Sequence, residues 1–146
     1  LKIRFRYIFD DNPYPGAPRI KAIPLEAYQA LKVGDLDILP LAIEHGTLDI
    51  LGFLFPHFAY LTDVKFIPAR TLELIHGIDV LIISALHHHP HHSHINLEEA
   101  LQYIERIQPK RCYLTHMSHS MGLHAETQAS LPSQVFFAYD GLEINI

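Results

Sequence analysis

The run Ile78–Ser84 restricts the possible folds most strongly, because it is apolar at almost every position. Continuous apolar runs of this kind are typical of strands that are covered on both faces of a sheet. A helix follows, with Asn96 as its N-cap and Glu99 as the partner in a capping box, and Pro109 ends it. The run Arg111–Thr115 then predicts another strand. Together these elements indicate a β-α-β unit, in which helices cover a sheet.

The remaining elements are predicted from alternation of apolar residues and from turn residues. Strands are expected at Ile3–Phe9, Arg19–Ile23, Leu36–Ile43, Leu48–Phe55 and Phe58–Leu61, and a terminal hairpin is expected at Val135–Ala138 and Leu142–Ile146. Helices are expected at Pro68–Gly77 and within Ser120–Ser130. The expected fold class is therefore α+β or layered α/β, in a single domain that spans residues 1–146.

Composition narrows the classes of function. No apolar stretch approaches the roughly 20 residues that a membrane-spanning helix needs, so no membrane partner is expected. The single cysteine, Cys112, excludes an internal disulfide framework and favours a cytoplasmic location. The net charge is −5 and the lysines and arginines are scattered, which makes nucleic acid an unexpected partner. An anionic substrate would need its countercharge from metal ions or from a few local cationic side chains.

Several chemistry-bearing side chains follow directly after predicted strands. His116 and His119 leave the strand that ends at Thr115, and His45 and Asp63 close two earlier strand-like runs. Where a strand ends, the rigid sheet positions the loop that follows, and binding and catalytic residues are concentrated in such loops. Imidazole and carboxylate groups are ligands for zinc, manganese or iron, and a carboxylate can bridge two ions. The pattern predicts a shared cleft in which His45, Asp63 and His116 hold metal.

The chain has 12 histidines, and many of them lie in the segment His87–His94. Its composition is typical of a metal-binding tract, although an exposed polar loop explains most of these residues equally well. His94 differs, because it directly precedes a capped helix whose free N–H groups and dipole favour an anion. His94 could therefore donate to a phosphate or protonate a leaving oxygen. His119 could act in the same way, or orient a metal ligand.

A set of short motifs, in a specific order along the whole chain, resembles the C-terminal part of metallo-β-lactamase-fold hydrolases. The similar branch is the one related to the phosphoribosyl cyclic-phosphate phosphodiesterase of phosphonate breakdown. The motifs are His45-Gly46, Gly52-Phe53, Ala59-Tyr60-Leu61-Thr62-Asp63, Pro90-His91-x-x-His94-x-Asn96-Leu97-Glu98-Glu99-Ala100-Leu101, Tyr113-Leu114-Thr115-His116-x-Ser118-His119 and Tyr139-Asp140-Gly141-Leu142-Glu143-Ile144.

This resemblance implies an αββα sandwich that holds two divalent metal ions, zinc or manganese. It implies that His45 and His116 are metal ligands and that Asp63 bridges both ions. It also implies that His94 contacts the substrate phosphate or assists the leaving group, and that His119 contacts substrate or orients a ligand. The implied reaction is hydrolysis of a small phosphodiester, including a cyclic one, by a hydroxide that the two metals activate.

One departure from the family is large, because the motif His-x-His-x-Asp-His occurs nowhere in the chain. We therefore expect residues 1–146 to be the back portion of an incomplete domain, inactive alone, whose front portion lies upstream. The strand-like pattern that starts at Ile3 agrees with this expectation. Two alternatives stay open. The chain could be a truncated, non-catalytic half-domain that binds at most one metal weakly or serves as an assembly piece, for example in a homodimer, or it could belong to a hydrolase of non-phosphate esters or thioesters.

Overall fold

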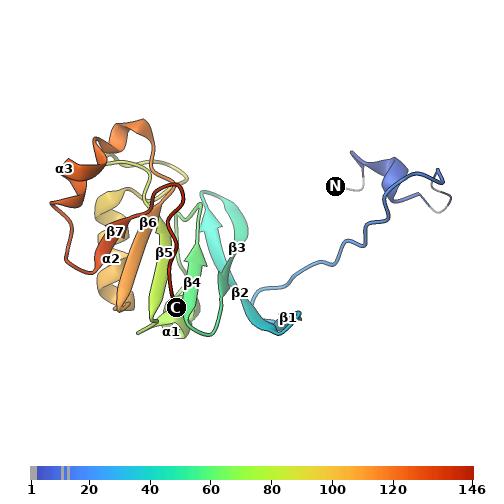
Figure 1. Cartoon of the computed structure of the whole chain (residues 1–146), viewed down its shortest axis with the longest axis horizontal. Helices are drawn as coiled ribbons and strands as arrows, with labels where there is room; N and C mark the ends of the chain where they lie inside the picture. The colour runs from blue at the N-terminus through green and yellow to red at the C-terminus, as the bar shows by residue number, and fades with distance from the viewer. Residues whose placement is uncertain (1–2, 11, 13) are drawn as a thin grey trace.

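The computed structural model describes residues 3–10, 12 and 14–146. Its centre is a seven-stranded sheet in which neighbouring strands follow one another in chain order (Figure 1). The strands are β1 (Leu31–Val33), β2 (Leu36–His45), β3 (Leu48–Leu54), β4 (Phe58–Leu61), β5 (Val80–Ser84), β6 (Arg111–Thr115) and β7 (Val135–Phe137). The helices are α1 (Ala69–Ile75), α2 (Leu97–Ile107) and α3 (His124–Gln128), with short 3-10 turns η1 (Arg6–Ile8) and η2 (His119–Met121).

Strand direction changes at the middle of the sheet. Strands β1 to β4 pair antiparallel, and β4 to β7 pair parallel. Each parallel strand is joined to the next by a segment that contains a helix, as a crossover connection requires. Because β2 is antiparallel to β3, and β3 to β4, strand β2 runs in the same direction as the parallel group. The carboxyl ends of β2, β4, β5 and β6 therefore meet at one edge of the sheet.

One face of the sheet packs against the helices. Leu81, Ile83, Cys112 and Leu114 alternate along β5 and β6, and each is fully buried in the same core as the apolar residues of α2. The predicted capping box starts α2, since the Asn96 side chain accepts from the Glu99 N–H and the Glu99 side chain accepts from the Asn96 N–H, both at 2.8 Å. This pair satisfies two backbone donors that the helix cannot satisfy itself.

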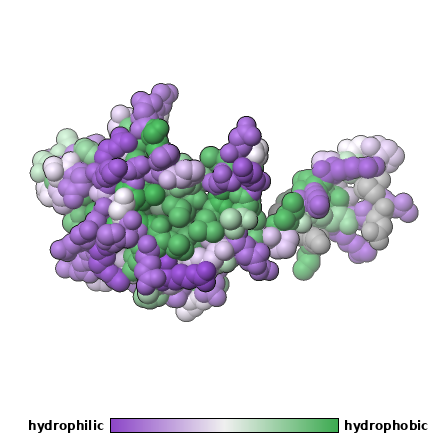
Figure 2. Space-filling model, turned by 90° about the horizontal axis from the view of Figure 1, so that it is seen from below, coloured by the Kyte–Doolittle hydropathy of each residue, from purple (hydrophilic) through white to green (hydrophobic). Residues whose placement is uncertain are grey.

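The opposite face of the sheet carries a second apolar row. The side chains at equivalent register positions are Phe53, Tyr60, Ile82, Tyr113 and Phe136, all of them half-buried or exposed. Within the described residues there is one sheet and one helical layer, so the fold is α+β and corresponds to part of the expected sandwich. Hydrophobic residues also gather across the middle of the body when it is seen from below (Figure 2).

Three predicted strands are wrong, and one strand was missed. Ile3–Phe9 forms a turn and η1, and Arg19–Ile23 forms no strand, because this arm extends away from the sheet without a strand to pair with (Figure 1). Leu142–Ile146 forms no strand either, since β7 pairs in parallel with β6 instead of closing a hairpin. The missed strand is β1, which turns into β2 through Gly34, whose φ is 61°.

Among the residues that the structure describes, no helix has both the length and the apolar character needed to cross a bilayer.

Candidate metal centre

The sheet topology brings the predicted ligands to one edge. His45 ends β2, Asp63 follows β4, and His116 follows β6, and these three strands share one direction. The carboxyl ends of parallel strands are where open sheets gather their functional side chains. The three side chains therefore reach the same edge although up to 71 residues separate them in the chain.

Two of these residues have a strained backbone. Asp63 has φ 59° and His116 has φ 63°, both in the left-handed region that side chains other than glycine rarely adopt. Such a conformation costs roughly 1–2 kcal/mol per residue and is found where the surrounding structure imposes it, often at functional sites. Each left-handed residue comes one or two positions after its strand ends, and so turns its side chain towards the shared edge.

Asp63 and three histidines form a contiguous cluster at this edge. The His45 and His94 Nε2 atoms are 3.2 Å apart, and Asp63 Oδ1 lies 3.4 Å from His116 Nε2 and 3.9 Å from His94 Nδ1. His45, Asp63 and His94 each offer one ligand atom within 4.8 Å of the others, which is close enough to share a metal ion. The His94 and His116 rings are 4.9 Å apart, so His116 lies beside this group.

His94 lies at the centre of the cluster and is more buried than Asp63 or His116. Its side chain is 13% exposed, and within the described part of the chain its Nδ1 is a buried atom without a hydrogen-bond partner. Burial lowers the pKa of His94, the nearby His116 and His45 lower it further, and Asp63 opposes the shift. A neutral imidazole beside a carboxylate, with an unpartnered nitrogen, fits a bound cation. The residues present therefore suit a divalent metal.

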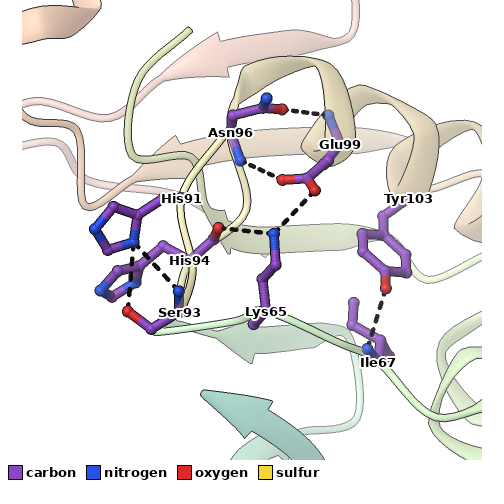
Figure 3. A network of polar contacts seen from close by, with 8 residues as sticks. All are labelled: Lys65, Ile67, His91, Ser93, His94, Asn96, Glu99 and Tyr103. Atoms are coloured by element: carbon purple, nitrogen blue, oxygen red, sulfur yellow. Dashed lines mark hydrogen bonds and ion pairs between the residues drawn. The ribbon is translucent and has the colours of Figure 1, made fainter. Parts of the chain in front are cut away.

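The loop that carries His94 is tied to the segment after Asp63. The Ile95 N–H donates to the Val64 carbonyl at 2.7 Å, and Lys65 Nζ lies 3.4 Å from the His94 carbonyl oxygen. Lys65 also forms an ion pair with Glu99 Oε1 at 3.0 Å (Figure 3). Sequence reasoning missed Lys65, and no local signal could have found it, because both of its partners come from another segment.

The start of α2 offers an anion fewer free N–H groups than expected. The Leu97 N–H donates to the His87 carbonyl at 2.9 Å, and the Glu99 N–H donates to the Asn96 side chain. Glu98 and Glu99 also place two negative charges in the first turn. The two carboxylates already complement the positive end of the helix dipole, and two of the first N–H groups are engaged, so the start of α2 is a poor site for an anionic substrate.

The other predicted residue, His119, stays apart from the cluster. It begins η2 and is exposed, and no contact found in the described residues joins its side chain to Asp63 or the clustered histidines.

The histidines of the segment His87–His94 also differ from one another in exposure. His88, His89 and His92 are exposed, as an ordinary polar loop would be. His91 is half-buried, and its ring lies 5.2 Å from that of His94. The sequence pattern predicts no separate role for His91.

Comparison with known proteins identifies a family whose sequence model matches this chain. The sequence model of the β-lactamase superfamily domain matches residues 1–117. An octanoyltransferase of Porphyromonas gingivalis is 38% identical over 144 residues, which are 98% of this chain and 29% of that protein.

Solved structures are similar over the same region. A diphosphatase of the PhnP family is 33% identical with a TM-score of 0.85, over 97% of this chain and 52% of that one. A metallo-β-lactamase-fold protein of Bacillus subtilis is 20% identical with a TM-score of 0.66, over 84% of this chain and 54% of that one. This last likeness concerns the fold alone. The chain spans about half the length of each of these two structures.

Proposed function

Because the chain belongs to the β-lactamase superfamily, we propose that it forms one side of the active site of a metal-dependent hydrolase. The observation that carries the proposal is the cluster of His45, Asp63, His94 and His116 at one sheet edge. Its donor atoms are nitrogen and oxygen, the set that zinc and manganese accept.

The proposed roles follow the sequence-based hypothesis. His45, Asp63 and His116 would hold two divalent ions, zinc or manganese, with the Asp63 carboxylate shared between them. Ions bound there would supply Lewis-acid activation of water and stabilisation of negative charge. His94 would contact the substrate and transfer a proton to its leaving oxygen, for which its buried ring between His45 and Asp63 is well placed. His119, which is exposed, is proposed as a residue that contacts substrate outside the cluster.

The proposed substrate is a small phosphodiester, including a cyclic one. Support comes from the similar PhnP-family diphosphatase, whose name places its chemistry at phosphorus. The small number of cationic side chains near the cluster also suits the proposal, since metal ions would then supply most of the countercharge. The proposed location is the cytoplasm, in keeping with a single cysteine that is buried and unpaired within the described residues.

We further propose that a separate segment completes the site. A metal ion usually requires about four donor atoms. The described cluster offers too few donor atoms for two ions. The family motif His-x-His-x-Asp-His would supply the missing ligands, and it is absent from the sequence. The open apolar row on the sheet would pack against the same segment.

A second candidate substrate class is an acyl ester or thioester. The octanoyltransferase is 38% identical to this chain, and its name indicates transfer of an acyl group. That relative is much longer than the shared region, so its named activity does not carry over directly.

One experiment separates these proposals. The protein is expressed from its full gene, with any segment encoded upstream of residue 1, and the metal content is measured by plasma mass spectrometry. Hydrolysis is then assayed with bis(4-nitrophenyl) phosphate, a cyclic phosphodiester and an octanoyl thioester. We expect about two metal ions and phosphodiester turnover that a chelator abolishes. Thioester turnover alone would support the acyl alternative, and a metal-free, inactive protein would contradict both.

A further inference from the structure

The neighbouring residue Ser93 determines which ring nitrogen of His91 carries the hydrogen. The Ser93 backbone N–H donates to His91 Nδ1 at 3.3 Å, and Ser93 Oγ lies 3.4 Å from the same atom. A backbone N–H can only donate, so Nδ1 must carry the lone pair. The neutral ring of His91 then carries its hydrogen on Nε2, and Nε2 is a hydrogen-bond donor.

The position of Ser93 is held from outside the loop. Ser93 is buried, and Gly46 in the β2–β3 turn packs directly against it. A Cβ atom at Gly46 would lie 3.2 Å from Ser93 Cβ, and the φ of 61° at Gly46 also favours glycine. The hydrogen bond to His91 is thus part of a packed arrangement between the turn and the histidine segment.

This arrangement is unsuited to metal binding by His91. A ligating histidine normally donates its other ring N–H to a neighbouring acceptor. Here the other ring nitrogen accepts from Ser93 instead. The same pattern recurs at His87, whose Nδ1 accepts from the His89 N–H at 3.2 Å. The rings of His87 and His91 therefore present Nε2–H donors, although the composition of the segment is typical of a metal-binding tract.

The His91 donor lies at the margin of the proposed metal centre. Its ring is 5.2 Å from that of His94, which is 4.6 Å from that of His45. Figure 3 shows the His91 and His94 rings lying together on the same side of the loop. Burial lowers the pKa of His91, and the neighbouring His92 and His87 lower it further, which keeps the ring neutral and its tautomer defined.

Several other donors near the cluster are engaged within the protein. The start of α2 uses its Leu97 and Glu99 N–H groups internally, and Lys65 is paired with Glu99 and lies beside the His94 carbonyl. Within the described residues no partner is found for the Nε2–H of His91, so an anionic group that reaches the cluster can accept a hydrogen bond from it.

We infer that His91 binds the anionic phosphoryl group of the substrate, by donating its Nε2–H to an oxygen that does not take part in bond cleavage. The inference rests on the proposed hydrolase function and deepens it. A phosphodiester and free inorganic phosphate share the chemistry that this donor recognises, so both are used as probes.

The first test measures the tautomer directly and needs neither metal nor activity. Nitrogen-15 NMR of the histidine-labelled, metal-free protein, expressed from its full gene, distinguishes a ring nitrogen with hydrogen from one with a lone pair. We expect the lone pair of His91 on Nδ1 and the hydrogen on Nε2. Hydrogen on Nδ1 would overturn the inference, whatever the outcome of the activity assays.

The second test uses the metal-loaded protein with its upstream segment. The change His91→Phe should raise KM for bis(4-nitrophenyl) phosphate and Ki for inorganic phosphate by roughly 10- to 100-fold, the loss expected for one hydrogen bond to a charged group, with little change in kcat. His91→Gln keeps an N–H near the Nε2 position and should stay within about threefold of the wild type. His89→Phe changes an exposed neighbour and serves as the matched control.

Each outcome is decisive. Equal losses in His91→Phe and His91→Gln, or an unchanged KM in His91→Phe, would refute the anion-binding role. A raised Ki for phosphate with an unchanged KM for the diester would assign the donor to free phosphate and would also contradict the inference. A wild-type protein without phosphodiester turnover would instead refute the proposed substrate class, while the NMR measurement would still decide the tautomer.

Discussion

The left-handed backbone at Asp63 and His116 links the local conformation of two residues to their chemistry. A φ near 60° at both positions costs free energy that an ordinary turn would avoid by using glycine or asparagine. Both residues place a metal-binding side chain at the same edge of the sheet. We interpret the strain as the cost of aiming these two groups at a common point.

The substitution Asp63→Asn tests the effect of backbone strain separately from metal binding. Asparagine tolerates the left-handed conformation and has nearly the same shape, but it cannot bridge two ions as a carboxylate does. In the intact protein we expect Asp63→Asn to lose metal while the free energy of unfolding of the metal-free form stays equal or rises by up to about 1 kcal/mol. Metal analysis and urea unfolding in a chelator measure the two effects. Retention of both metals would contradict the bridging role.

Replacement of His94 by Ala tests the role of the central histidine. If His94 acts on the substrate, the variant should keep its metals and lose turnover by roughly 100-fold or more. The short distances from His94 to His45 and Asp63 make ligation the competing role. Loss of metal from His94→Ala, measured by plasma mass spectrometry, would identify His94 as a ligand. His92→Ala, an exposed change in the same loop, is the control.

Among the secondary-structure elements, close contact between β3 and its neighbour depends on Gly52. A Cβ atom at this position would lie 2.3 Å from Leu61 Cδ2 and 3.2 Å from the Tyr60 carbonyl oxygen. Leu61 is fully buried on the helix-covered face, so it has little room to move. The missing side chain at Gly52 therefore allows β3 to pack closely against β4, the strand that leads to Asp63.

Gly52→Ala should therefore lower the free energy of unfolding by about 1–3 kcal/mol, as overpacking of a core usually does. Leu61→Ala alone leaves a cavity and should cost about 2–5 kcal/mol. The double variant should be more stable than the sum of the two losses implies, because the shortened side chain makes room for the new methyl group. Denaturant unfolding of the four proteins measures this coupling, and strict additivity would contradict the contact.

In the whole molecule, one face of the sheet lacks a covering layer within the described residues. The row of Phe53, Tyr60, Ile82, Tyr113 and Phe136 is half-buried or exposed, whereas the alternate residues are covered by helices. Contiguous apolar surface of this kind favours association. The chain also spans about half of the similar diphosphatase. Both observations support a protein in which another segment packs on this face.

Residues 1–146 alone should therefore hold little metal, show no phosphodiesterase activity and pair or aggregate. Addition of the upstream segment should restore about two metals, activity and a defined oligomeric state, because it supplies ligands and covers the apolar row. Analytical ultracentrifugation and metal analysis of the two forms measure the difference. A monomer of the short chain that binds two metals stoichiometrically would overturn the proposal.

The sequence by itself determined the elements whose signals are local. The capping box at Asn96 and Glu99 specified where α2 begins, and the apolar run around β5 specified a buried strand. The positions of His45, Asp63 and His116 at strand ends were also predictable, because the sequence itself marks where a strand ends. The resemblance to metallo-β-lactamase-fold proteins added the family, which the match over residues 1–117 confirms.

Tertiary structure decided what depends on partners from distant segments. Ile3–Phe9 alternates like a strand but has no neighbour with which to share hydrogen bonds, and so forms a turn and η1. The contact of His94 with His45 requires the histidine loop to reach the β2–β3 turn, which no spacing in the chain reveals. The tautomer of His91 likewise depends on a Ser93 that Gly46 holds in place. Hydrogen-bond partners and packing are properties of the folded chain, so they could only be read from its structure.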